Sequence, residues 1–397
     1  MSSSTAMQKV AQHYIDRNAF CGIEWAVKHR CDLVESGQAG LADHDAGKPM
    51  PEHPIYRIYS MTKPIVSIAA LILIERNQLQ LYDPVAAFIP AFGQQTILDE
   101  DGSRSPSVVP PTVEHLLTHR AGLSYDFLPD CPVANLYREA GLIENANLSL
   151  EELATILGEM PIIAEPGTRW KYSYATDVLA RVIEVACDRS IADVLDDLVL
   201  KPLGMEETSF KVAEEQRSRL MTMYGAQSLS EIMNPSGEQT LQVTDVDSTY
   251  PVDSSTFHRG GLGLYSTTSD YLRFCEFLHS GHTADGRRLL SSAMVNMMWT
   301  NRIPESYPML QVGLNPLPGY GWNLFGRVMV NIGQSMALTG LGEGGWAGAG
   351  ATYFWVDRAN QLSGVVMTQY LGSILPMSSE MRAACYVMLD DFNHVKS

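Results

Sequence analysis

The feature that most constrains this chain is a helical segment that is apolar on nearly every face. Residues 57–81 read RIYSMTKPIVSIAALILIERNQLQL, and their spacing predicts a helix from about Ser60 to Gln78. Pro64 falls in the first turn, where a missing N–H costs little. Because a helix that is apolar all round must be buried all round, the rest of the fold has to wrap around this segment. The segment nevertheless carries a lysine, Lys63, near its start.

Ser60 and Lys63 are spaced i, i+3, so they share one face of the predicted helix. At a helix start, unpaired N–H groups and the macrodipole favour developing negative charge. A lysine desolvated by an apolar helix has a lowered pKa, so it can take the serine proton or hold another base in its charged form. The alternative is a capping serine beside a lysine that reaches solvent, because S-x-x-K alone also arises by chance.

Two later segments offer partners for this pair. In PGTRWKYSYATDVL, Tyr172 lies in a turn before a helix, and a phenol near an ammonium ionises more readily, which makes it a candidate general base. Its alternative role is that of a buried, hydrogen-bonded aromatic. In GEGGWAGAGATYFWVD, glycines let a strand edge approach a ligand, and its N–H groups can complete an oxyanion hole with that of Ser60. The alternative for this segment is a glycine-rich loop that forms a turn and has no role in binding.

The order of elements predicts an α/β (α+β) fold. Strand patterns occur at residues 23–43 and 351–369, the second as a hairpin, while residues 83–250 are mainly helical and rich in loops. The simplest assembly is one antiparallel sheet built from both chain ends, flanked by helices, with a mainly helical lobe inserted. We expect residues 1–83 and 257–397 to form the sheet lobe and residues 84–256 the inserted lobe, with the active site between them.

Several local expectations accompany this assembly. Residues 93–111 read as a polar linker, and residues 260–267 as a strand. Thr112 and Ser149 are expected to cap helices, Ser149 through a capping box with Glu152. Residues 269–280 and 376–393 are expected to be helical, the first ending at Gly281. Residues 221–256 suggest a long loop or flap, whose large side chains either line an acyl pocket or pack in the core or a lid: Met221, Met223, Tyr224 and Tyr250.

Composition excludes several classes of partner. A formal net charge of −17 argues against nucleic acid and anionic membranes. The longest apolar run, Ile65 to Ile74, is too short to span a bilayer. The first 20 residues show no secretory signal pattern, and the six cysteines are scattered without a C-x-x-C pair, which indicates free thiols in the cytoplasm. The composition favours no particular oligomeric state.

Two other motifs have weak support, and a third is missing. GLGEGG at residues 340–345 spells G-x-G-x-x-G but does not join a strand to a helix, so no dinucleotide site is predicted. His115 and His119 are spaced i, i+4, yet no glutamate of an H-E-x-x-H motif and no cysteine cluster accompanies them, which favours a structural role. A G-x-S-x-G nucleophile elbow is missing, which argues against an α/β-hydrolase. We expect no cofactor and no metal.

Taken together, the three motifs resemble those of the serine β-lactamase and penicillin-binding-protein superfamily. The resemblance is to the class C β-lactamase-like branch, and most closely to the family VIII carboxylesterases. S-x-x-K matches Ser60 to Lys63, Y-S-x matches Tyr172 to Tyr174, and W-x-G matches Trp346 to Gly348. Four further stretches match family landmarks in order: LYDPVAAFIPAF, TVEHLLTHRAGL, LKPLGMEETSF and GGLGLYSTTSDYLRF. The resemblance spans about Gly22 to Gln369.

The resemblance implies roles for individual residues. Ser60 would be the nucleophile, with Lys63 and Tyr172 sharing the proton transfers. The backbone N–H groups of Ser60 and Ala349 would form the oxyanion hole. The substrate would contact three residues: Tyr174, Trp346 and Gly348.

Two of these positions depart from the β-lactamase pattern. Trp346 stands where β-lactamases use a lysine to hold the carboxylate of the antibiotic, and it offers an apolar wall and one N–H without a charge. Tyr174 replaces the asparagine that contacts an amide. Both changes favour neutral acyl esters over penicillins.

The sequence therefore predicts a serine carboxylesterase that cleaves short-to-medium acyl esters of small molecules through a Ser60 acyl-enzyme. Alternatives on the same scaffold remain open. One is a β-lactamase or an amide hydrolase of the D,D-peptidase or D-aminopeptidase type. Another is an acyltransferase or amidase that hands the acyl group to an alcohol or amine. A third is a binding module that has kept the fold without the chemistry.

Overall fold

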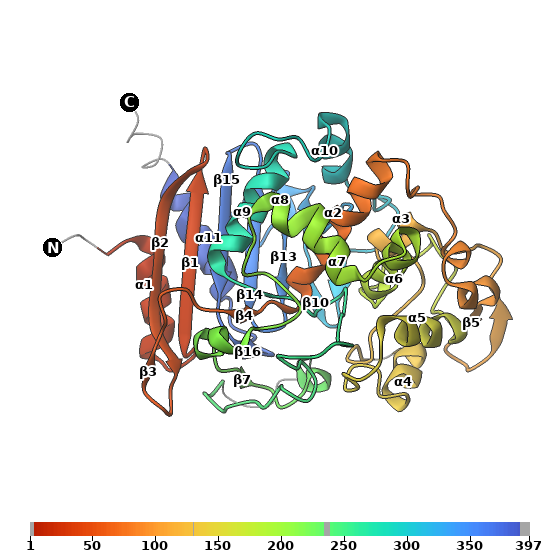
Figure 1. Ribbon diagram of the computed structural model, residues 1–397, viewed down its shortest axis with the longest axis horizontal. Helices are drawn as coiled ribbons and strands as arrows, with labels where there is room; N and C mark the ends of the chain where they lie inside the picture. Colours follow the sequence, from red (N-terminus) through yellow and green to blue (C-terminus); the bar gives the residue numbers. More distant parts are fainter. Residues whose placement is uncertain (1–3, 130, 234–238, 390–397) are drawn as a thin grey trace.

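One antiparallel sheet organises the computed structural model, which describes residues 4–129, 131–233 and 239–389. The sheet has eight strands in the order β11-β12-β13-β14-β15-β1-β2-β3. At its centre β1 (Gly22–His29) pairs with β15 (Leu362–Met367), so that Glu24 lies opposite Met367. Strands from the two chain ends thus lie side by side (Figure 1), which confirms the predicted fold class.

The remaining elements are placed around this sheet. Its other strands are β2 (Asp32–Asp43), β3 (Lys48–Pro49), β11 (Tyr320–Trp322), β12 (Arg327–Met329), β13 (Gly344–Gly348) and β14 (Thr352–Asp357). Short two-stranded pairs are formed by β4 (Tyr56–Arg57) with β8 (Tyr265–Ser266), β5 (Thr96–Leu98) with β6 (Arg104–Pro106), β7 (Tyr224–Gly225) with β16 (Tyr370–Leu371), and β9 (Gln311–Val312) with β10 (Asn315–Pro316). The α-helices are α1 (Ala6–Asp16), α2 (Thr62–Glu75), α3 (Val113–Leu117), α4 (Pro132–Glu139), α5 (Leu150–Glu159), α6 (Ala175–Cys187), α7 (Ile191–Leu195), α8 (Lys201–Leu203), α9 (Thr268–Ser280), α10 (Ser292–Trp299) and α11 (Met377–Val387).

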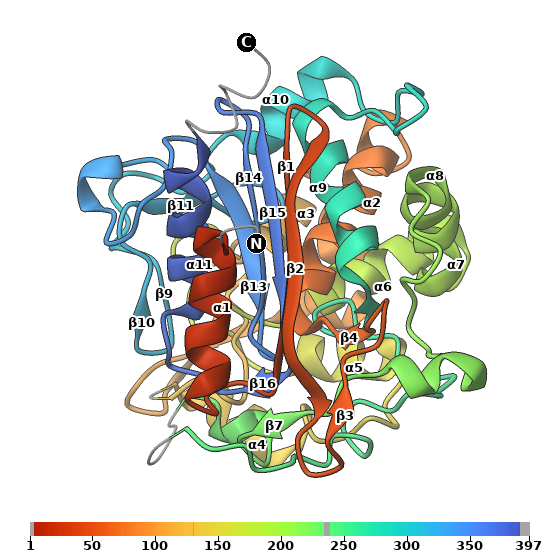
Figure 2. The ribbon, with the colours of Figure 1, turned by 90° about the vertical axis from the view of Figure 1, so that its left-hand side faces the viewer.

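Both faces of the sheet are covered by helices. Figure 2 shows α1 and α11 side by side on one face, with α2 and α9 on the opposite side. Alternate residues of β14 belong to two different cores: Trp355 packs in the core beneath α1 and α11, whereas Phe354 and Val356 pack in the larger core that contains α2. A strand buried on both faces is apolar at successive positions, which explains the unbroken run TYFWV.

Helix α2 is buried along nearly its whole length, as predicted. Residues 62–73 are all buried, and Lys63 among them is 2% exposed. The helix is shorter than expected, because Ser60 lies in a preceding 3₁₀ turn, η1 (Tyr59–Met61), and Asn77 adopts a left-handed φ of 57° just beyond its end. The nucleophile candidate therefore stands at the entrance to the helix rather than inside it.

The predicted caps are confirmed. Thr112 forms a capping box with His115 at the start of α3, and Ser149 forms one with Glu152 at the start of α5. Gly281 ends α9 with a left-handed φ of 75°. No helix in the described ranges has both the length and the apolarity needed to cross a membrane.

Two local predictions were wrong. The supposed linker at 93–111 contains the β5–β6 hairpin. Its turn is closed by a backbone hydrogen bond from Asp99 N to Ser103 O, and Gly102 has a φ of 84°. The supposed strand at 260–267 is a strand only at Tyr265–Ser266. Its glycines instead permit close approach, because a Cβ at Gly260 or Gly261 would collide with α6.

Residues 221–256 contain only β7 and a short 3₁₀ turn in their described part, and residues 234–238 lie outside it. The large side chains of this segment pack in the core, each 2% exposed or less: Met221, Met223, Tyr224 and Tyr250.

The closing helix is described as far as Val387, and the predicted residues 390–393 lie outside the described part. The division into two lobes at residues 83/84 and 256/257 stays a prediction.

A buried ionic network ties the edge of the sheet to α11. Glu343, fully buried just before β13, lies 3.5 Å from Arg327 of β12 and 3.2 Å from Arg382 of α11. Tyr320 donates a hydrogen bond to the same carboxylate at 2.8 Å. Burial works to raise the pKa of Glu343, but the two guanidinium groups hold it below its ordinary value.

We expect Glu343→Ala to lower the free energy of unfolding by about 3–5 kcal/mol, because it leaves two buried guanidinium groups uncompensated. Urea denaturation followed by circular dichroism measures the change. Glu151→Ala is the control, since it removes an exposed partner of Arg181 and should have little effect. An unchanged urea midpoint for Glu343→Ala would contradict the stabilising role of the network.

Candidate active site

The structure brings the three predicted catalytic side chains together. Lys63 Nζ lies 3.1 Å from Ser60 Oγ and 4.7 Å from the centroid of the Tyr172 ring. The Ser60 side chain also lies close enough to Tyr172 for its hydroxyl to lower the pKa of the phenol. The indole N–H of Trp346 donates to Tyr172 Oη at 3.0 Å, which adds one of the predicted substrate-binding residues to the same cluster.

Local backbone geometry presents Ser60 at the surface of the cluster. Tyr59, directly before it, has a φ of 42°, a conformation that is uncommon for an aromatic residue. The Tyr59 ring packs against Tyr250 with centroids 4.9 Å apart, which fixes the turn. Ser60 itself is partly exposed while Lys63, one turn further on, is buried, so the hydroxyl is accessible and the amine is not.

Tyr172 is held by the chain that follows α3. The residues on either side of the Tyr172–Ser173 pair are anchored by backbone bonds, from Lys171 N to His119 O at 2.9 Å and from Tyr174 N to Ser124 O at 3.2 Å. The Tyr172 ring packs against His119, with centroids 4.9 Å apart, and is 3% exposed. The phenol is therefore fixed by its surroundings before any ligand binds.

Lys63 is placed to act as a base. Its Nζ donates to the carbonyl oxygen of Gly261 at 2.7 Å. Burial lowers the pKa of Lys63 to about 7, and the negative charge of Asp177 only partly opposes this. A substantial fraction of the amine is neutral at neutral pH, and a neutral amine 3.1 Å from Ser60 Oγ can accept the hydroxyl proton.

Tyr172 does not have the lowered pKa that the sequence suggested. Burial raises the pKa of Tyr172 above its ordinary value, and the hydrogen bonds with Ser60 and Trp346 offset only part of this. Desolvation dominates because the whole ring is enclosed by other aromatic side chains. Tyr172 is therefore a neutral phenol that can relay a proton, which makes Lys63 the better candidate for the base.

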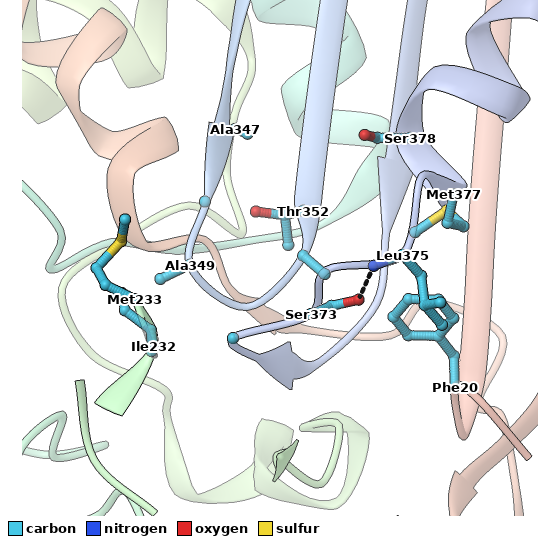
Figure 3. Close-up of a pocket in the computed structure, with 13 residues that line it drawn as sticks. Phe20, Ile232, Met233, Ala347, Ala349, Thr352, Ser373, Leu375, Met377 and Ser378 are labelled. Carbon is cyan, nitrogen blue, oxygen red and sulfur yellow. Dashed lines mark hydrogen bonds between the residues drawn. The ribbon is translucent and has the colours of Figure 1, made fainter. Parts of the chain in front are cut away.

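Strand β13 carries the remaining candidates past the nucleophile. A Cβ at Gly348 would collide with the carbonyl oxygen of Ile58, so glycine lets the strand lie against the segment that leads into Ser60. Ala349 follows and borders a cavity of about 230 Å³ (Figure 3). The role of the Ala349 N–H in an oxyanion hole stays a prediction, as does contact between Gly348 and a substrate.

Tyr174 points away from this cluster. Its hydroxyl donates to the Asp126 carboxylate, with oxygens at 3.1 and 3.2 Å, and the side chain is 1% exposed. Its ring packs against Tyr125 with centroids 4.4 Å apart. The structure thus shows Tyr174 as part of the packing below Tyr172, and its contact with a substrate stays a prediction.

Both histidines of the predicted pair, His115 and His119, make contacts within the fold. His115 Nδ1 accepts the backbone N–H of Thr112 at 3.2 Å, and His119 packs beside Tyr172. Burial lowers the pKa of His119 well below its ordinary value. Across the described part of the chain, no three histidine, cysteine or acidic side chains gather as metal ligands. Residues 340–345 lead into β13 and not into a helix, so the glycine motif lacks the dinucleotide-binding context.

Sequence reasoning missed several residues that surround Lys63. Tyr125 places its ring centroid 5.1 Å from Lys63 Nζ, Gly261 supplies the carbonyl acceptor, and Asp177 lies nearby in α6. The only signal was an aspartate at position 177, on a helix whose first residues are mostly apolar. Nothing in the local pattern linked Gly261 to Lys63, because nearly 200 residues separate them.

Comparisons with known proteins agree with this geometry. The family described as Beta-lactamase matches residues 7–383. Protein Rv1367c of Mycobacterium tuberculosis is 31% identical over 365 residues, covering 89% of this chain and 87% of that protein. Esterase EstB of Burkholderia gladioli is 30% identical over 356 residues, covering 87% of this chain and 86% of EstB. The solved structure of EstCE1, a hydrolase with promiscuous acyltransferase activity, has a TM-score of 0.81 at 25% identity, covering 96% of this chain and 97% of EstCE1.

The match over nearly the whole chain defines the class: this protein belongs to the β-lactamase family. Within that family its similarity extends to esterases, so the superfamily indicated by the motifs is confirmed.

A direct consequence concerns the pH dependence of Ser60 reactivity. Because the pKa of Lys63 is about 7, protonation below that pH removes the base, and we expect the rate of Ser60 labelling by a fluorophosphonate to fall there. The fall should approach about tenfold for each further pH unit. Second-order labelling rates, with the site mapped by mass spectrometry, check this. A rate that stays constant from about pH 5 to about pH 8 would show that Lys63 is not the base.

Proposed function

We propose that this protein is a serine hydrolase of carboxylic esters that works through an acyl-enzyme on Ser60. The observation that carries the proposal is the cluster of hydroxyl, amine and phenol, with the amine 3.1 Å from the hydroxyl and partly deprotonated near neutral pH. The esterases among its relatives support the same class of reaction.

Acylation follows from the protonation states. Ser60 Oγ attacks the ester carbonyl while its proton passes to the neutral amine of Lys63. The backbone N–H groups of Ser60 and Ala349 are proposed to bind the oxyanion of the tetrahedral intermediate. As the C–O bond to the leaving group breaks, a proton passes through Tyr172 to the departing alkoxide and Tyr172 is reprotonated by Lys63. The net result is an alcohol, an acyl-Ser60 ester and a neutral Lys63.

Deacylation repeats these steps with water. The neutral amine of Lys63 accepts a proton from the attacking water, directly or through Tyr172, and the oxyanion forms in the same hole. Collapse of the intermediate releases the carboxylic acid, and the proton returns to Ser60 Oγ. Charge and proton count are restored, and no cofactor enters the cycle.

The environment of Trp346 favours a neutral substrate. Trp346 is packed against Trp322, with ring centroids 4.6 Å apart, and its one N–H is already donated to Tyr172. This position therefore offers an apolar surface and no cation for a carboxylate. Neutral esters suit such a wall better than an anionic antibiotic does.

The cavity beside Ala349 is proposed to hold the acyl chain, although Ser60 itself does not line it. Figure 3 shows Ile232 and Met233 on one side of it and Leu375 and Met377 on the other. At about 230 Å³ it is smaller than most drug-binding pockets, which favours short-to-medium chains.

We expect kcat/KM for p-nitrophenyl esters to rise from acetate to hexanoate, because each buried methylene contributes about 0.8 kcal/mol. Ser378→Phe should fill the cavity from α11 and reduce the preference for hexanoate over acetate about tenfold, the effect of one to two methylene groups. Ser379→Phe is the matched control, since Ser379 is the next residue of the helix and does not line the cavity. Equal chain-length profiles for the two variants would place the acyl chain elsewhere.

The nucleophile has its own test. Ser60→Ala should leave only background hydrolysis of p-nitrophenyl butyrate, while intact-mass spectra of the wild type show an acyl adduct on the peptide that contains Ser60. The partly exposed position of Ser60 makes the substitution compatible with folding, which thermal unfolding checks. Substantial turnover by Ser60→Ala would mean that the nucleophile is another residue.

Acyl transfer is the second candidate, because EstCE1 is described as a hydrolase with promiscuous acyltransferase activity. An alcohol or amine that replaces water in the second half-reaction would give a new ester or amide from the same acyl-enzyme. Adding such acceptors and identifying products by mass separates transfer from hydrolysis.

A strong preference for nitrocefin over the p-nitrophenyl esters would instead favour a β-lactamase.

We also propose that the protein acts in the cytoplasm, on small-molecule esters. All six cysteines are free in the structure, and most are buried as small apolar side chains. This is the usage expected where thiols stay reduced. Detection of the native protein in soluble cytoplasmic fractions would test the assignment.

A further inference from the structure

The contacts behind Lys63 point to a residue that adjusts the base from a distance. We propose that Asp177 is a positioning residue, whose buried carboxylate acts on Lys63 through Gly261 and so sets the pH range in which Ser60 reacts. The inference deepens the proposed function, since it depends on Lys63 being the base for Ser60.

Asp177 is buried in an unusual way for a carboxylate. It lies in the first turn of α6 and is 0% exposed. One oxygen, Oδ1, accepts the backbone N–H of Gly261 at 2.9 Å. The other, Oδ2, is buried without a hydrogen-bond partner among the described residues. A carboxylate this deep is costly, so its retention calls for a compensating interaction.

Gly261 connects this carboxylate to Lys63. The same residue that donates its N–H to Asp177 accepts a hydrogen bond from Lys63 Nζ at 2.7 Å. A Cβ at Gly261 would collide with Asp177 Oδ2, so glycine lets the carboxylate lie directly against this stretch of backbone. Asp177 thereby fixes the carbonyl that aims Lys63 Nζ at Ser60.

The charge of Asp177 also acts on Lys63. The carboxylate of Asp177 favours the ammonium form of Lys63, against the desolvation that favours the neutral amine. In return, burial raises the pKa of Asp177, while Lys63 and the Gly261 N–H work to lower it. The neighbouring cation, Arg259, donates to the carbonyl oxygen of Asn145, and its charge also works to lower the pKa of Asp177.

The other titratable groups around Lys63 are neutral and do not compete for this role. Tyr172 and Tyr125 face the amine with their rings, and burial raises the pKa of both phenols. His119 is also close, and burial together with the charge of Lys63 lowers its pKa well below the ordinary value. Asp177 is therefore the charged group whose removal should change the protonation of Lys63.

The test is the pH dependence of kcat/KM for p-nitrophenyl butyrate in Asp177→Asn. The amide keeps an acceptor for the Gly261 N–H and removes the charge, so the ammonium of Lys63 is less stable. The pH below which the rate falls should move down by about one unit, the usual effect of losing a nearby opposite charge. Relative activity at acid pH then rises, a change that a merely structural defect does not produce.

The matched control is Asp126→Asn, which removes a buried carboxylate from the same region that is bonded to Tyr174 and not to Gly261. It should leave unchanged the acid limb of the pH profile, that is, the pH range over which kcat/KM falls as the pH is lowered. Asp177→Ser is the second variant, and it should shift the limb in the same direction as Asp177→Asn. If a folded Asp177 variant loses activity at the same acid pH as the wild type, the inference is overturned. It is also overturned if both Asp177 variants fail to fold while Asp126→Asn folds.

Fluorophosphonate labelling of Ser60 keeps this test separate from the proposed function. If the wild type labels or turns over ester and the limb does not move in Asp177→Asn, the inference about Asp177 fails alone. If the wild type neither labels at Ser60 nor turns over ester, the proposed function itself fails.

Discussion

The proposed chemistry of this protein depends on keeping one amine out of water beside one hydroxyl. Lys63 is almost fully buried because it belongs to a helix that is enclosed along residues 62–73. One carbonyl oxygen at 2.7 Å does not replace the hydration of an ammonium, so the neutral form is favoured and the pKa falls to about 7. Ser60 lies outside the helix proper and partly exposed, which gives a substrate access to the hydroxyl while the amine stays dry.

The sheet supplies the fixed side of the site. Strand β13 is paired with β12 and β14, and the carboxylate of Glu343 at its start is tied to arginines of β12 and α11. These interactions hold the strand that carries Trp346, whose N–H reaches Tyr172 at 3.0 Å. Because Tyr172 comes from the chain beyond α5, the hydrogen bond joins the sheet to the helical part of the molecule across the site.

Much of this arrangement could be predicted from the sequence because it is encoded in local patterns. The unbroken apolar run of α2 required burial, the strand patterns at both ends required a shared sheet, and the spacing of Ser60 and Lys63 placed them one turn apart. The resemblance to a family then linked Tyr172 and Trp346 to them, and their hydrogen bond is the structural counterpart of that link.

What could not be predicted arises from contacts between distant segments. The fold brings Gly261, in the turn before β8, and Asp177, in α6, next to Lys63 of α2. No local pattern in the sequence predicts these contacts. The left-handed φ of Tyr59 and the enclosure of Tyr172 also depend on tertiary packing. For this reason the sequence identified Tyr172 correctly as a neighbour of Ser60 but assigned it too low a pKa.

The residue at position 346 decides how the proton work is divided. A lysine there, as in the β-lactamase pattern, would place a second ammonium next to the Tyr172 hydroxyl and would favour ionisation of the phenol. Trp346 offers the same hydroxyl a hydrogen bond without a charge, and burial then keeps Tyr172 neutral. With the phenol unable to ionise easily, the desolvated amine of Lys63 is the group whose protonation state changes near neutral pH. Trp346 thus offers no cation to an anionic substrate at this position, and in the proposed mechanism the base is the amine rather than the phenol.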